Sequence, residues 1–324
     1  YCFVMARPEE TAEALKKPLA VVRAVKMLRN LRIGLAGGRV PGFYTSNFDE
    51  LLLRREFGVA VEVLDLLEIV KTADTLTEAE LAAARKVVKE SAAKVNAVSA
   101  ADLELAAKMY GSFRKTAEKY QLSTYAVRCW PEFSDLFGIA PCAVLGMLSD
   151  TGFATSCEGD VTGAFTMKLL QALAGGGIPF FVDLIQYDTG KNTGVIWHCG
   201  AAPKGLCRNF DETELRLHMR VDGGDKKGVT NDFSLKAGRV TVAKFDTDAD
   251  GKMRMLIAPG TAIDTEPFLR GNPLTIHFDG AVPELVDTIM KKGFEHHYAV
   301  IHADVKQELL QFCEWFHIEP VVVG

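Results

Sequence analysis

Two acidic side chains stand in a glycine-containing turn at residues 155–164, where the sequence reads Thr-Ser-Cys-Glu-Gly-Asp-Val-Thr-Gly-Ala. A short apolar segment precedes this turn and a helix-forming segment follows it. Ligands of open α/β folds bind at the carboxyl ends of the strands, where such a turn lies. Glu158 is therefore a candidate ligand-binding residue. Asp160 is better explained as a cap of the following helix, because a carboxylate near a helix N-terminus is stabilising.

Three further segments place a polar side chain at the end of an apolar strand. Asp183 ends the run Phe-Phe-Val-Asp, His198 ends Val-Ile-Trp-His, and residues 295–298 read Glu-His-His-Tyr. An unpaired carboxylate close to a core strand is costly, and neither Glu158 nor Asp183 has a basic neighbour in its own segment. A shared cation would relieve both carboxylates. The pattern therefore predicts one divalent-metal site.

The candidate metal ligands are Glu158, Asp183, His198 and His297. Carboxylate and imidazole ligands in which oxygen predominates suit Mn²⁺ or Mg²⁺ better than a thiolate-rich zinc site does. Two carboxylates beside one cation can also serve as a catalytic base and acid. Glu158 and Asp183 are predicted to form that catalytic pair.

Aromatic side chains near these segments are candidates for contacting a substrate. Trp130 and Phe133 follow a predicted strand end, and Trp197 precedes His198. Aromatic faces commonly line sugar pockets, although an aromatic residue at a strand end is as often part of the core. Trp130, Phe133, Trp197 and His198 are the predicted substrate-binding residues.

The first half of the chain alternates predicted strands and helices. Thr77, with Glu80 three residues later, reads as the capping box of one helix. Strands separated by helices predict an α/β domain with a doubly wound parallel sheet. The expected strands are 31–36, 59–65 and 124–130, and the expected helices are 77–95, 101–120, 141–148 and 164–174.

The second half has a different pattern. Three consecutive glycines at 175–177 suggest a hinge, so domains are expected at 1–175 and 176–324. Strand and turn signals then predict antiparallel hairpins in a β-barrel-like C-terminal domain. The expected strands are 215–221, 238–245, 252–257 and 320–323, with a helix at 304–316.

The composition excludes several classes of protein. The chain has 324 residues, 48% of them hydrophobic, and its net charge is −5 with the basic residues scattered, so neither nucleic acid nor a membrane is an expected partner. No apolar run approaches the ~20 residues of a transmembrane helix. The seven widely spaced cysteines indicate a reduced, cytoplasmic protein.

Two other motifs are weak. Residues 34–39 resemble part of a dinucleotide fingerprint, but no GxGxxG is present and no helix follows. Residues 246–251 resemble the start of a calcium loop, yet position twelve of that loop is Ile257 and predicted strands flank it. An Asp-Gly hairpin turn is the better interpretation.

Four motifs in this order resemble the L-fucose isomerase and L-arabinose isomerase superfamily, especially its L-fucose isomerase-like branch. They are the segment 157–167, the acid at Asp183, the segment 197–203 and the late Glu-His-His. The resemblance implies a metal-dependent aldose–ketose isomerase that acts on a free monosaccharide through a cis-enediolate. By motif, the manganese-type ion would be held by Glu158, Asp183 and His297 with His198 nearby, and His296 stays an alternative to His297.

The family architecture implied by the resemblance has two α/β domains and a barrel-like C-terminal domain. The chain begins at Tyr1, and the first of these domains is expected to be absent from it. The resemblance also implies a homo-oligomer, a trimer or hexamer, in which a neighbouring chain completes the substrate pocket. A non-catalytic sugar- or metal-binding protein and a metal-dependent sugar epimerase or aldolase are the alternative functions.

Overall fold

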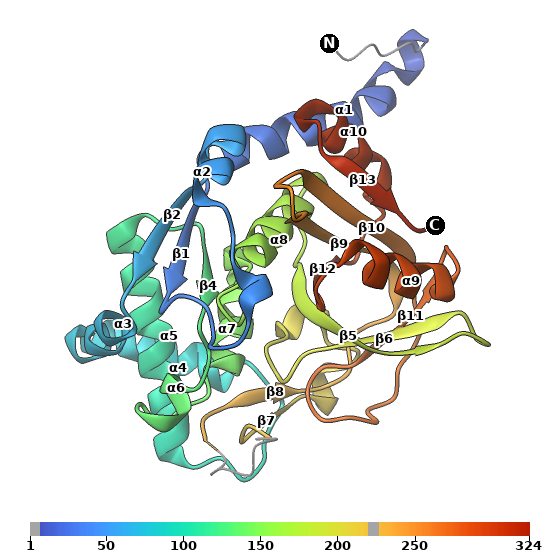
Figure 1. Cartoon of the computed structure of the whole chain (residues 1–324). Coiled ribbons are helices and arrows are strands. Elements are labelled where there is room, and N and C mark those ends of the chain that lie inside the picture. Colours follow the sequence, from blue (N-terminus) through green and yellow to red (C-terminus); the bar gives the residue numbers. More distant parts are fainter. Residues whose placement is uncertain (1–6, 220–226) are drawn as a thin grey trace.

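The computed structural model describes residues 7–219 and 227–324, and its elements form two main sheets with helices between and around them (Figure 1). The fold is α/β, as predicted, with a parallel sheet in the first half of the chain and a larger mixed sheet in the second. The first helix, α1 (Thr11–Leu28), is not among the predicted helices. It packs against α8 and α10, which belong to distant parts of the sequence.

The parallel sheet contains β1 (Arg32–Ala36) between β2 (Ala60–Leu64) and β4 (Thr124–Val127). Ser156 forms an isolated parallel bridge with Ala126, which extends the sheet toward the turn that carries Glu158. The capping box of Thr77 and Glu80 is present, as predicted. The helices of this half are α2 (Glu50–Leu52), α3 (Leu66–Thr72), α4 (Glu78–Lys89), α5 (Ala100–Tyr120), α6 (Glu132–Asp135), α7 (Cys142–Leu148) and α8 (Val161–Leu173).

The larger sheet has the strand order β11-β6-β5-β12-β9-β10-β13. Strand β11 also pairs with β10, so hydrogen bonding runs around a closed ring of six strands, and β13 is attached to β10 in parallel. All other pairings in this sheet are antiparallel. The strands are β5 (Phe180–Asp188), β6 (Thr193–Trp197), β9 (Gly238–Thr247), β10 (Met253–Ala262), β11 (Leu274–Phe278), β12 (His297–Ile301) and β13 (Glu319–Val322).

Strands β9 and β10 form the predicted hairpin. Its turn is closed by Asp248, whose carboxylate accepts hydrogen bonds from the backbone N–H groups of Asp250 and Lys252, and Gly251 takes a positive φ of 77°. The segment that resembles a calcium loop is thus a turn between strands, as the Asp-Gly interpretation predicted.

Helix α8 lies between the two sheets and packs against β1 and β4 on one side and against β9 and β12 on the other (Figure 1). Most of its side chains are buried, because both faces of the helix meet a sheet. The turn before α8 is consequently held where the two sheets meet. Two amphipathic helices, α9 (Val282–Lys292) and α10 (Lys306–Phe316), belong to the second half of the chain.

A third, small sheet consists of β3 (Lys94–Val95), β7 (Glu214–Arg216) and β8 (Thr230–Asp232). The strand expected at 215–221 is therefore much shorter than predicted, and the end of that expected segment lies outside the described residues. Among the residues at 7–219 and 227–324, no helix has the length and apolar character to cross a membrane. The six cysteines in these ranges are all free thiols.

Candidate functional site

The turn that carries Glu158 is fixed by the parallel sheet and by close backbone packing. The N–H of Gly159 donates to the carbonyl of Val127 at the end of β4. Glu158 and Gly159 both take positive φ values, 59° and 72°. A Cβ on Gly159 would lie 2.3 Å from the carbonyl oxygen of Gly38, so only glycine fits there. The turn thereby holds Glu158 at the carboxyl end of the sheet.

Asp183 and His297 are brought together by strand pairing. Asp183 on β5 stands directly opposite His297 on the antiparallel strand β12. On its other side, Asp183 stands opposite Trp197 on β6. Directly opposed residues of antiparallel strands project from the same face, with their Cβ atoms about 5 Å apart. The register therefore places all three side chains in one row across the sheet.

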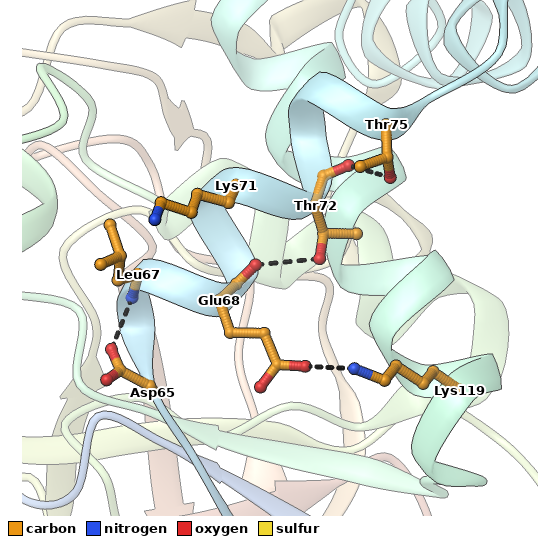
Figure 2. A pocket seen from close by; sticks show the side chains of 7 residues that line it. All are labelled: Asp65, Leu67, Glu68, Lys71, Thr72, Thr75 and Lys119. Atoms are coloured by element: carbon orange, nitrogen blue, oxygen red, sulfur yellow. Dashed lines mark hydrogen bonds and ion pairs between the residues drawn. The ribbon is translucent and has the colours of Figure 1, made fainter.

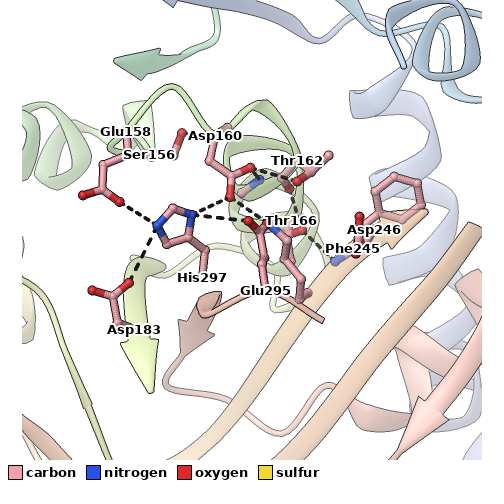
Figure 3. A network of polar contacts seen from close by, with 12 residues as sticks. Ser156, Glu158, Asp160, Thr162, Thr166, Asp183, Phe245, Asp246, Glu295 and His297 are labelled. Carbon is pink, nitrogen blue, oxygen red and sulfur yellow. Dashed lines mark hydrogen bonds and ion pairs between the residues drawn. The ribbon is translucent and has the colours of Figure 1, made fainter. Parts of the chain in front are cut away.

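Glu158 and Asp183 approach the same nitrogen of His297 from different elements, as Figure 3 shows. The Nε2 of His297 lies 2.6 Å from Oε2 of Glu158 and 3.9 Å from Oδ1 of Asp183. That Asp183 oxygen is buried and has no hydrogen-bond partner. Three of the four predicted metal ligands thus lie around one nitrogen, and Asp183 is the most distant of them, outside the close group of Glu158, His296 and His297.

A buried ionic network lies on the other side of the His297 ring (Figure 3). The Nδ1 of His297 is 3.1 Å from Oδ2 of Asp160, and the same oxygen accepts a 2.7 Å hydrogen bond from the Nζ of Lys244. Lys244 also forms an ion pair with Glu295. The side chains of His297, Asp160 and Lys244 are 0% exposed. A carboxylate behind a histidine fixes the ring orientation and makes the other nitrogen a better metal ligand.

Asp160 therefore has two roles. It is the N-cap of α8, as expected, because its carboxylate accepts the N–H of Gly163. It also orients His297, a role that sequence reasoning did not predict. Sequence reasoning also missed Lys244, whose only signal is a charged residue within the apolar strand segment 240–245.

The environment shifts the pKa of each group at this centre. Burial acts to raise the pKa of Glu158, but the hydrogen bond to His297 and the nearby imidazoles lower it below its ordinary value. Burial raises the pKa of Asp183. Burial acts to lower the pKa of His297, yet the hydrogen bonds to Asp160 and Glu158 raise it to about 10. These contacts favour the protonated imidazole, whose Nε2–H would donate to Glu158.

His198 is buried near the same centre but is arranged differently. Its Nδ1 accepts a 2.9 Å hydrogen bond from the backbone N–H of Cys199, and its Nε2 is buried without a partner. Because Nδ1 is an acceptor, a neutral ring carries its proton on Nε2. In this state His198 is arranged to donate a hydrogen bond rather than to ligate a metal.

His296 remains close to the centre as well. Its side chain is exposed, yet one ligand atom each of Glu158, His296 and His297 lie within 4.8 Å of one another. The geometry favours His297, because only that ring is held by a carboxylate behind it. A second close group, Asp160 with Glu295 and His297, already contains the ammonium of Lys244 and needs no metal ion.

The carboxylates open into a cavity of about 320 Å³, which is within the range of small-molecule sites. Trp130, Trp197 and His198, three of the predicted substrate-binding residues, line it. Phe133 does not, because its side chain is 0% exposed and packs in the core against Phe113 and Phe137.

Phe43 also lines this cavity and was missed by sequence reasoning. Its ring contacts Trp130 edge-on and stacks on His297 with centroids 6.0 Å apart. It belongs to the loop after β1, just past the segment 34–39 that resembles part of a dinucleotide fingerprint. That loop therefore contributes a wall of the cavity.

A second concavity, of about 400 Å³, lies on the outer surface of α3 and α5 (Figure 2). Its polar groups satisfy one another: Glu68 is paired with Lys119, and Asp65 accepts the N–H of Leu67. Thr72 and Thr75 donate to backbone carbonyls. These groups are held by helix caps and an exposed ion pair, and no described cluster of metal-ligating side chains lies among the residues that line this surface.

The residues at the centre fit a hard divalent cation. A cation beside Nε2 of His297 would meet this imidazole and the Glu158 carboxylate, and the Asp183 carboxylate would complete the set by moving toward them from 3.9 Å. Two carboxylates and an imidazole are a donor set that suits Mn²⁺ or Mg²⁺. The partnerless oxygen of Asp183 would gain a ligand bond there. The fold and the site thus define an α/β protein with a carboxylate–imidazole centre in the wall of a small-molecule cavity.

Comparisons with known proteins agree with this class. The C-terminal domain model of L-fucose isomerase matches residues 196–323. A sulfoquinovose isomerase of Priestia aryabhattai is 31% identical over 325 residues, which cover 99% of this chain and 71% of the relative. One from Alkalicoccus urumqiensis is 31% identical over 324 residues, covering 99% and 72%.

A more distant relative is an L-arabinose isomerase of Aeromonas hydrophila subsp. hydrophila, which is 22% identical over 327 residues covering 97% of this chain and 64% of the relative. The chain belongs to the L-fucose isomerase and L-arabinose isomerase superfamily. It is accordingly an enzyme of the aldose–ketose isomerase class.

Proposed function

We propose that this protein is a metal-dependent isomerase that interconverts the aldose and ketose forms of a free monosaccharide. The observation that carries the proposal is the convergence of Glu158 and Asp183 on the Nε2 of His297, at the wall of a cavity of about 320 Å³. Glu158, Asp183 and His297 would hold Mn²⁺ or Mg²⁺. When bound, the cation would stabilise negative charge on two neighbouring sugar oxygens and make the C2 proton more acidic.

The side chains of this chain would carry the proton. Converting a 2-hydroxy aldehyde into a 1-hydroxy ketone takes a proton from C2 and returns one to C1, through an enediolate. One of the pair Glu158 and Asp183 acts as the base and the other as the acid. The free Nε2–H of His198 would donate to a sugar oxygen, and its fixed orientation comes from the backbone N–H of Cys199.

The aromatic walls would select the sugar. Trp130 is partly exposed in the cavity, and the indole N–H of Trp197 is held by the carbonyl of Arg270, which fixes its ring. Sulfoquinovose, the sugar in the names of two relatives, is an anionic hexose and belongs in the substrate panel. Among the described lining residues the basic groups are His198 and His218.

We further propose the domain boundary near residue 175 and a barrel formed by the closed ring of β5, β6, β9, β10, β11 and β12. The ring is supported by the pairing of β11 with both β6 and β10. We also propose that the protein is a homo-oligomer in which a neighbouring chain contributes to each cavity.

The test is the conversion of a panel of pentoses, deoxyhexoses and sulfonated hexoses, each with Mn²⁺ and each with a chelator. Glu158→Gln should lower kcat/KM by about 10²–10⁴-fold, because it removes a group that transfers a proton. Glu284→Gln, at an exposed position on α9, is the matched control and should retain activity. Full activity of Glu158→Gln would remove that residue from the proposed role.

The same panel separates the alternatives. Sugar and metal binding without conversion would indicate a non-catalytic binding protein. A C2 epimer or a cleaved product would indicate an epimerase or aldolase acting on the same enediolate. Ketose formation that needs the metal supports the isomerase.

A further inference from the structure

A second group of potential metal ligands lies in the same cavity, away from the carboxylates. The Sγ atoms of Cys142 and Cys199 are 3.7 Å apart, and one ligand atom each of Cys142, Cys199 and His218 lie within 4.8 Å of one another. All three side chains line the cavity. They come from the first turn of α7, from the loop after β6 and from the segment after β7.

The separation of the two sulfurs matches a tetrahedral cation site. Two thiolates bound to zinc at about 2.3 Å, with a tetrahedral angle between them, are about 3.8 Å apart. A disulfide would bring the sulfurs to about 2.05 Å. The observed 3.7 Å separation therefore already matches that of two thiolates bound to one cation.

The backbone holds the two thiols in this arrangement. Gly146, one turn after Cys142 on α7, lies so close to the loop after β6 that a Cβ on it would be 2.6 Å from the carbonyl oxygen of Ala202. The side chain of Asn231 donates to that same carbonyl, and the backbone N–H of Asn231 donates to the carbonyl of Gly200. These contacts fix the loop that carries Cys199 against α7. The cluster is consequently pre-organised, as a metal site requires.

The third residue, His218, is held by a backbone hydrogen bond. The backbone N–H of His218 donates to the carbonyl of Lys227 at 3.2 Å. The imidazole completes a set of two sulfurs and one nitrogen, and the cavity lies on the remaining side. Three protein ligands with an open fourth position are the arrangement found in zinc sites that bind a water or substrate oxygen.

We propose that Cys142, Cys199 and His218 form a second cation site, selective for zinc and similar thiophilic divalent cations, with its open position facing the sugar cavity. Thiolate ligands select such cations, whereas carboxylate oxygens suit Mn²⁺ and Mg²⁺. The cavity would then hold two chemically different cation sites. A thiophilic cation bound at the Cys142–Cys199–His218 site would lie next to a sugar bound in the cavity.

Cobalt spectroscopy tests this site directly. The full chain, kept reduced with a phosphine and saturated with Mn²⁺ to occupy the carboxylate site, is titrated with Co²⁺ and then with Zn²⁺. We expect one equivalent of Co²⁺ to produce a thiolate-to-metal charge-transfer band, and Zn²⁺ to abolish it by displacement. Cys142→Ser and Cys199→Ser should weaken Co²⁺ binding about 100-fold or more, since even residues behind the ligands of a metal cost 10–100-fold.

Three further variants make the result specific. Cys207→Ser, a half-buried thiol outside the cavity lining, should keep the band. His218→Gln should weaken binding while the fold, checked by circular dichroism, is retained. Glu158→Gln should keep the band although it loses isomerase activity, which separates this inference from the proposed function. Absence of the band in the wild-type chain, or its survival in Cys142→Ser, would overturn the inference.

Discussion

His297 is held between two environments that differ in charge and in access. On its Nδ1 side are Asp160, Glu295 and Lys244, all enclosed by protein. On its Nε2 side are Glu158 and Asp183, which open to the cavity. Lys244 supplies positive charge to the buried acids Asp160 and Glu295, whereas Glu158 and Asp183 have only imidazoles as cationic neighbours. The distribution of charge around His297 thus depends on one buried lysine.

Removal of that lysine should be severe. Lys244→Met leaves Asp160 and Glu295 without their cation, and removing one partner of a buried ion pair costs about 3–5 kcal/mol. We expect a loss of this size in the free energy of unfolding, measured with urea. Lys292→Met removes only the exposed pair with Glu319 and should cost less than about 1 kcal/mol. Similar losses in the two variants would contradict the role of Lys244.

The raised pKa of His297 predicts how the metal-free protein responds to pH. Its pKa rises from 6.5 to about 10 on folding, so the native state binds the proton more tightly than the unfolded state does. The stabilisation is complete below about pH 6.5. It is lost as the pH rises toward 10, by at most about 1.4 kcal/mol per pH unit.

Urea unfolding in a chelator between pH 6.5 and 10 measures this dependence. His297→Gln removes this titrating group and should therefore flatten the dependence of the free energy of unfolding on pH. Any slope that remains comes from titrating groups that both proteins share, such as the cysteines. The same slope in His297→Gln and in the wild type would show that His297 is not the group responsible.

At the scale of elements, the turn before α8 depends on a single glycine. Gly159→Ala places a Cβ 2.3 Å from the Gly38 oxygen at a φ of 72°, whereas Gly138→Ala has the same φ and no atom within 4 Å. Gly138→Ala should cost about 1–2 kcal/mol from backbone strain alone. Gly159→Ala should cost more and should also lower kcat, because the turn must move with Glu158.

Unfolding midpoints and isomerase rates of the two variants together test this role. Equal losses of stability, with activity unchanged in both, would show that the contact between Gly159 and Gly38 does not position the site.

Sequence patterns pointed to candidate site residues that border an apolar run. Glu158, Asp183 and His297 became candidates for this reason, although β5 continues past Asp183 to Asp188, so that only the apolar run and not the strand ends there. Lys244 could not be predicted, since its partners Asp160 and Glu295 lie far away in the sequence and its own strand is otherwise apolar.

The same limit applies to the elements. The β9–β10 hairpin is local and was predicted, whereas the position of β12 between β5 and β9 depends on pairing across more than fifty residues. Phe133 was misassigned because an aromatic residue near a strand end has the same sequence signature in a cavity wall and in a core.

At the scale of the molecule, the carboxylate–imidazole centre links the two main sheets. Glu158 comes from the parallel sheet, and Asp183 and His297 come from the mixed one. A cation bound there should stabilise the native state by about 2.7 kcal/mol at a concentration 100-fold above its Kd. We expect Mn²⁺ to raise the melting temperature and EDTA to reverse the increase.

Asp183→Asn should lose most of this stabilisation, while Asp287→Asn, on the exposed face of α9, should retain it. An equal Mn²⁺ response in the wild type and in Asp183→Asn would place the cation elsewhere.

The strand order also has a consequence for synthesis on the ribosome. Strand β12 fills the slot between β5 and β9, but it is translated after both of them and after β10 and β11. Until residue 301 has left the exit tunnel, β5 and β9 would lack the strand that pairs with both of them in the native sheet, and His297 would be absent from the centre. Unpaired edges invite association with other chains. Late ribosomal stalling would therefore yield fragments that are prone to aggregate and that lack the imidazole of the centre.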